Sequence, residues 1–86
     1  MHTKTVIVGS AEGLHARPAG IIAEAAEKYD DDIEISIADE DAADAASAML
    51  IMALGADKGA QVTVTSDNSD AVAEIAGLIE QDLDVE

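Results

Sequence analysis

The sequence contains no cysteine, phenylalanine or tryptophan, and it has one proline and one tyrosine. Without cysteine, the chain cannot form disulfides, thiolate metal sites, iron–sulfur clusters or a cysteine nucleophile. Its core must therefore be built from isoleucine, valine, leucine, methionine and small residues, of which alanine is the most abundant. The longest apolar stretch, residues 45–54, is interrupted by Ser47 and is far shorter than the roughly 20 residues of a membrane span. The first residues lack the apolar region of a signal peptide, so we expect a cytoplasmic protein without membrane insertion.

Positive charge is also scarce, because 4 lysine and arginine residues face 19 aspartate and glutamate residues, for a formal net charge of -15. This balance argues against nucleic-acid binding, which needs basic side chains to neutralise phosphates. Two interpretations remain. The protein docks onto basic partner surfaces, or it is adapted to molar salt, where a Debye length of about 3 Å screens its self-repulsion. Abundant alanine and aspartate, with few lysines and aromatic residues, favour the second interpretation and predict a halophilic source.

The periodicity of the apolar residues predicts both strands and helices. Alternation predicts strands at 3–8, 33–37 and 62–65, with a weaker strand near 42–43 beyond a hairpin tip at 39–41. Steps of three and four residues predict helices at 17–28, 47–54 and from the cap residues at 67–70 through Leu83. The 86 residues fit one domain, residues 1–86, of the α+β class. We expect a mostly antiparallel sheet with helices on one face and solvent on the other.

The acidic clusters do not match a metal site. Asp30, Asp32 and Glu34 begin like a calcium loop, but no glycine follows, and Ile33 and Ile35 are needed in a strand. We therefore predict solvated turns, with no metal and no cofactor. An acyl carrier protein is similarly small and acidic, but Ser47 lacks the Asp-Ser-Leu setting of such proteins, and the strands contradict a helical bundle.

His15 lies in the segment Gly13-Leu14-His15-Ala16-Arg17-Pro18-Ala19. Arg17 is the only arginine, and Pro18 is typical of a first helical turn, so the amides of Ala16 and Arg17 should lie near the imidazole. A helix N-terminus beside a guanidinium binds anions. Because no serine, cysteine or aspartate completes a triad, the imidazole itself is the candidate nucleophile for a phosphoryl group. An exposed loop histidine without a chemical role is the alternative.

This segment closely resembles the active-site motif of the HPr phosphocarrier family of the phosphoenolpyruvate-dependent sugar phosphotransferase system, and the similarity continues over nearly the whole chain. The resemblance implies an open-faced β-sandwich of four antiparallel strands covered by three helices. It implies that His15 accepts a phosphoryl group at Nδ1 from enzyme I and passes it to a IIA component, with Arg17 steadying the group. The protein would then be a monomeric carrier and not an enzyme.

The resemblance also assigns roles in the second helix. Ala48, Met49 and Met52 match family positions that dock onto partner proteins, although a methionine at these places is also compatible with the core. Ser47 matches a serine that a kinase phosphorylates in some members. Ala46 stands where regulated members usually have lysine, so a plain helix cap is the favoured role of Ser47.

Two further functions remain open at this point. The same motif would suit a related carrier that serves a dihydroxyacetone kinase or a regulatory phosphorelay. The chain would also suit a regulatory module that binds a partner without transferring phosphate, although His15 argues against this function because such a module does not need the acceptor.

Overall fold

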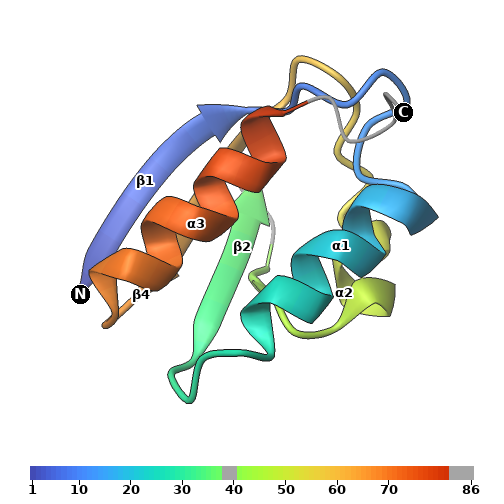
Figure 1. Ribbon diagram of the computed structural model, residues 1–86. Coiled ribbons are helices and arrows are strands. Elements are labelled where there is room, and N and C mark those ends of the chain that lie inside the picture. The colour runs from blue at the N-terminus through green and yellow to red at the C-terminus, as the bar shows by residue number, and fades with distance from the viewer. Residues whose placement is uncertain (38–40, 82–86) are drawn as a thin grey trace.

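A computed structural model describes residues 1–37 and 41–81 of the chain. The elements follow the order β1 (His2–Ile7), α1 (Ala16–Ala26), β2 (Ile33–Ile37), β3 (Ala43–Asp44), α2 (Ala48–Ala53), β4 (Gln61–Ser66) and α3 (Ser69–Glu80). The four strands form one sheet in the order β1-β4-β2-β3, with every neighbouring pair antiparallel. The three helices lie on one side of this sheet (Figure 1). The predicted α+β architecture is therefore confirmed.

Strand alternation separates the two faces of the sheet. Val62 and Val64 of β4 and Ile35 of β2 are buried beneath the helices. Thr5 and Thr63 pair on the outer face, where their hydroxyl oxygens are 2.9 Å apart. The period of two that predicted these strands thus corresponds to one apolar face and one polar face.

The core under the helices consists of aliphatic side chains. Tyr29, the only tyrosine of a sequence without phenylalanine or tryptophan, is half-buried and packs against its margin. The helices α1 and α3 both contribute alanines and branched aliphatic residues to this core: Ala19, Ile22, Ala23, Ala25, Ala26, Ala71, Val72, Ile75, Ala76 and Ile79. Small side chains let helices and sheet approach closely, so a chain without phenylalanine or tryptophan still closes its interior.

The helix ends differ slightly from the predicted bounds. Helix α1 ends at Ala26, and the amides of Lys28 and Tyr29 donate to the carbonyls of Ala25 and Ala26, three residues earlier. Such bonds tighten the last turn of a helix, and the periodicity cannot distinguish them from a continued helix. Residues 39 and 40 of the predicted hairpin tip lie outside the described residues. Leu83, at the predicted end of the last helix, lies outside them as well.

A hydrogen-bonded cluster joins the end of α1 to α3. Lys28 Nζ donates to Glu74 Oε2 (3.0 Å), and the Tyr29 hydroxyl donates to Glu74 Oε1 (2.5 Å). The Tyr29 hydrogen bond, followed by that from Lys28, lowers the pKa of the Glu74 carboxyl below its ordinary value. Because this carboxyl has the lower pKa in the folded state, its contribution to stability is present above its unfolded pKa and is lost as the pH falls through its folded pKa.

Helix α2 has defined ends. Ser47 is its N-cap, and the Ser47 Oγ accepts a hydrogen bond from the amide of Leu50 (3.2 Å). Beyond the C-cap, Gly55 has a φ of 67°, the left-handed conformation typical of a glycine that ends a helix. Both ends are therefore fixed by local interactions, which matters for a helix of only 6 residues.

Replacing Ser47 with alanine removes the acceptor for the Leu50 amide. We expect the free energy of unfolding of Ser47→Ala to fall by about 0.5–2 kcal/mol in a denaturant titration. Ser69→Ala is the matched control, because Ser69 is the exposed first residue of α3 and Asn68 already caps that helix. Equal stability of Ser47→Ala and the wild type would contradict the capping role.

Candidate functional site

The loop before α1 is held against the segment that follows α2. The Gly13 amide donates to the carbonyl of Ser10 (3.0 Å), and the Leu14 amide donates to the carbonyl of Ala56 (2.9 Å). Gly13 has a φ of 77°, and a Cβ at this residue would lie 2.3 Å from the Ala56 carbonyl oxygen. Glycine is therefore required here by both conformation and space. The Leu14 side chain is buried, which anchors the chain next to His15 in the core.

His15 stands at the N-terminus of α1. Its backbone is extended, with φ -84° and ψ -166°, and its carbonyl accepts the amide of Ala19 (2.9 Å). The imidazole makes no capping hydrogen bond, and the side chain is 36% exposed. It is therefore open to a reagent from solvent while its backbone is fixed as the N-cap.

The first turn of α1 supplies the surroundings expected of an anion site. The helix begins at Ala16, one residue before the predicted start, and the buried Pro18 lies in the first turn as predicted. The helix has no internal acceptor for the amides of Ala16 and Arg17, and its dipole places partial positive charge there. Arg17 is exposed and lies two residues after His15 in the chain. The fold thus places His15, Ala16 and Arg17, the three consecutive residues that the sequence nominated, at the start of α1.

Glu12 adds a contact that the sequence did not predict. Its Oε2 lies 3.6 Å from the Nε2 of His15, and its side chain is 78% exposed. An acidic residue three places before the histidine was the available signal, but its direction depends on the turn that Ser10 and Gly13 form.

Helix α2 presents its methionines to solvent. Met49 is 75% exposed and Met52 is 40% exposed, whereas Ile51 is fully buried. The alternative that these methionines belong to the core is therefore wrong. Ala48 is half-buried, and Leu50, which the sequence did not nominate, is 47% exposed.

Helix α2 also lies close to the loop that carries His15. It packs against α1 (Figure 1). The hydrogen bond from the Leu14 amide to the Ala56 carbonyl ties the residue before His15 to the segment after α2. The exposed apolar side chains of α2 and the candidate phosphoryl site are therefore held in a fixed relation.

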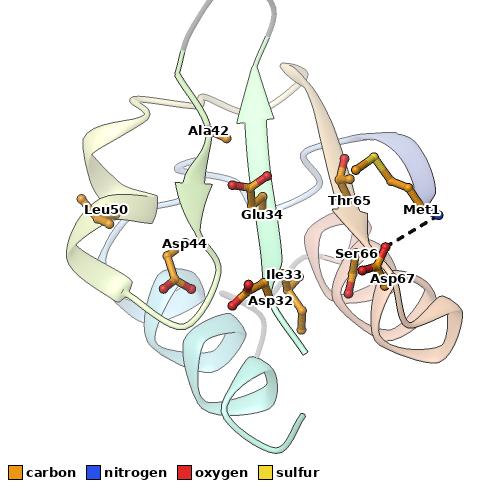
Figure 2. A pocket seen from close by; sticks show the side chains of 10 residues that line it. All are labelled: Met1, Asp32, Ile33, Glu34, Ala42, Asp44, Leu50, Thr65, Ser66 and Asp67. Carbon is orange, nitrogen blue, oxygen red and sulfur yellow. Dashed lines mark ion pairs between the residues drawn. The ribbon is translucent and has the colours of Figure 1, made fainter. Parts of the chain in front are cut away.

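A hollow of about 490 Å³ lies on the open face of the sheet, where it is bordered by several acidic side chains (Figure 2). Glu34 and Asp44 stand directly opposite each other on neighbouring strands, and the terminal amine of Met1 lies 3.7 Å from Asp67 Oδ1. His15 and Arg17 are not among its lining residues. Within the described ranges, no three histidine, aspartate or glutamate side chains are grouped as metal ligands. This hollow is therefore separate from the site at His15.

Comparison with known proteins identifies the chain's relatives. Residues 2–81 match the family described as PTS HPr component phosphorylation site. Over 78 residues the chain is 40% identical to the phosphocarrier protein HPr of Streptomyces coelicolor, covering 91% of this chain and 84% of that protein. Over 76 residues it is 38% identical to the phosphocarrier protein HPr of Haloferax volcanii, covering 87% and 85%. It is also similar to the crystal structure of HPr-C-His from Thermoanaerobacter tengcongensis, with a TM-score of 0.86 and 31% identity, covering 100% and 99%.

These relatives agree with the architecture and with the segment around His15. Within residues 1–37 and 41–81, no helix has the length and apolar character of a membrane span. The family match covers the sheet, the three helices and the motif at the start of α1. The chain thus belongs to the HPr family and is a phosphocarrier of the phosphotransferase system, not itself an enzyme.

Proposed function

We propose that His15 carries the phosphoryl group at Nδ1, receiving it from the phosphohistidine of enzyme I and passing it to a IIA component. The observation that carries this assignment is the partly exposed imidazole at the N-terminus of α1, inside the segment that matches the family. The Nδ1 lone pair attacks phosphorus and forms an N–P bond. The N–P bond to the donor imidazole breaks, and its electron pair stays on the donor nitrogen. Because one N–P bond replaces another, the transfer is readily reversible.

The first turn of α1 would bind the group that is transferred. The amides of Ala16 and Arg17 point to the anion-binding end of the helix, and the guanidinium of Arg17 offers paired donors to phosphoryl oxygens. Positioning and charge stabilisation are what a phosphoryl transfer needs from the protein. Arg17 is thus the residue that steadies the phosphoryl group while it is bound and while it moves.

We assign partner docking to Ala48, Met49 and Met52. The two methionines form an exposed apolar surface, and α2 is tied to the His15 loop through Leu14 and Ala56. A flexible thioether side chain repacks against different surfaces, which suits one carrier that meets enzyme I and a IIA component in turn.

The remaining parts of the proposal concern setting and assembly. We place the protein in the cytoplasm as a monomer in which residues 1–86 act as one HPr-like domain without metal or cofactor. Ser47 is assigned to capping α2, since its Oγ accepts a hydrogen bond from the Leu50 amide, and not to regulation by a kinase.

A carrier for a dihydroxyacetone kinase or a regulatory relay would share His15, and transfer assays with those partners would distinguish such a carrier from one that serves sugar uptake. A module that only binds would take up no phosphate.

We further propose that the protein is adapted to high salt. The support is its charge of -15. The chain is 38% identical to the Haloferax relative and 40% identical to the Streptomyces relative, so sequence identity does not indicate the habitat. The like charges Glu34 and Asp44 in direct register would repel each other at low ionic strength. At molar salt this repulsion is screened.

Labelling tests the phosphoryl site. Incubation with labelled phosphoenolpyruvate and enzyme I should give an acid-labile, base-stable phosphate on the wild type and on the control His2→Ala, but none on His15→Ala. Arg17→Ala should keep its fold and slow transfer by roughly ten-fold or more, less than for a buried oxyanion donor because Arg17 is exposed. Label retained on His15→Ala would overturn the assignment of His15, and unchanged rates would remove Arg17 from it.

Calorimetric titration with enzyme I and with a IIA component tests the docking surface. Met49→Ala should raise the Kd by about five-fold or more, because Met49 is the most exposed residue of the surface and an energetically central contact contributes at least that much. Ile7→Ala is the control, since Ile7 is an exposed apolar residue at the end of β1. Equal affinity of Met49→Ala and the wild type for both partners would show that docking lies elsewhere.

Thermal unfolding at increasing potassium chloride tests the adaptation to salt. We expect the melting temperature to rise between about 0.1 M and about 3 M salt as repulsion between carboxylates is screened. A parallel series in sucrose separates charge screening from the general effect of an excluded solute. A melting temperature that is insensitive to salt would refute the adaptation.

A further inference from the structure

Glu12 contacts the ring nitrogen of His15 that is not assigned to phosphoryl transfer. Its Oε2 is 3.6 Å from Nε2, and the two residues are three apart in the chain. The intervening turn is held by the hydrogen bonds from Gly13 to Ser10 and from Leu14 to Ala56. The carboxylate is therefore presented to the imidazole by a fixed stretch of backbone.

We propose that Glu12 is a positioning residue that keeps the proton of the neutral His15 ring on Nε2 and so places the lone pair that accepts the phosphoryl group on Nδ1. The inference rests on the assignment of His15 made above and deepens it. In a neutral imidazole one nitrogen carries the proton, and the partner of each nitrogen decides which one. A carboxylate near Nε2 favours the form with the proton there, because it attracts the N–H and repels a lone pair.

The same placement matters after transfer. When the bond from Nδ1 to phosphorus forms and the donor's N–P bond breaks, the electron pair leaves with the donor ring and the Nε2 proton stays in place. The phosphorylated ring then carries positive charge, which the Glu12 carboxylate faces at Nε2. The two ring nitrogens point in different directions, so the carboxylate meets the proton and not the incoming phosphorus. No proton has to move during the transfer.

The exposure of the pair determines the size of the effect. With the Glu12 side chain 78% exposed and that of His15 36% exposed, water competes for both groups. Exposed ion pairs change an equilibrium by about two- to five-fold, and we expect that range here. Glu12 would thus adjust the ring and its rate of phosphorylation, whereas His15 accepts the phosphoryl group and Arg17 has the larger effect on the rate.

The test measures the ring directly in the unphosphorylated protein. Nitrogen-15 NMR at a pH where the imidazole is neutral reports the population of each tautomer, and His15→Ala identifies which signals belong to His15 and which to His2. Glu12→Ala should raise the ratio of the Nδ1–H form to the Nε2–H form by about two- to five-fold. Glu24→Ala is the control, because it removes the same charge from an exposed place further along α1.

The second measurement is the initial rate of phosphorylation by enzyme I and phosphoenolpyruvate. Glu12→Ala should slow it by a similar factor, and circular dichroism should show the same fold. An unchanged tautomer population in Glu12→Ala overturns the proposal whatever the rate does, and an equal change in Glu24→Ala overturns it as a general charge effect. Neither result bears on whether His15 is the acceptor, which the labelling of His15→Ala decides separately.

Discussion

The close approach of the Gly13 backbone to Ala56 is the constraint on which the site depends. It joins two parts of the chain that are more than forty residues apart, the loop before α1 and the segment after α2. The hydrogen bond from Leu14 fixes the direction of the chain immediately before the N-cap, and the buried Leu14 side chain prevents it from turning away. Without this contact, His15 would have neither a fixed position at the start of α1 nor a fixed distance from α2.

The proposed site at His15 would let a strongly acidic chain bind an anion. The helix N-terminus provides partial positive charge without a basic side chain, and the single arginine stands in the same turn. Most of the carboxylates lie on exposed surface, as Glu34, Asp44 and Asp67 do around the hollow on the open face of the sheet (Figure 2). The carboxylates around this hollow are thus separate from the site at His15, where Glu12 does lie against the imidazole.

Much of the fold could be predicted because its signals are local. The alternating isoleucines of β2 specify a strand, which is found as predicted, and Gly55 ends α2 through its own conformational freedom. The predicted end of α1, residue 28, lies two residues beyond its observed end at Ala26, because Lys28 and Tyr29 still follow the helical spacing. Their hydrogen bonds go to Glu74 of another helix, α3. Tertiary contacts of this kind have no signature in a single stretch of sequence.

The site divides in the same way. His15 and Arg17 are neighbours in the chain, so their placement followed from the start of one helix. The contact of Glu12 with His15 depends on a turn, and the exposure of Leu50 depends on how α2 lies on β3 and α1. Such directions are set by the packing of elements that the sequence alone does not place.

The interior made of alanine and branched aliphatic residues has a consequence for the thermodynamics of folding. Alanine has no side-chain rotamers to lose, and isoleucine loses fewer than long flexible side chains do. Ordering the eleven buried side chains of α1 and α3, six of which are alanines and one a proline, therefore costs little conformational entropy. A small hydrophobic interior can then hold together a surface that carries an unusually large charge.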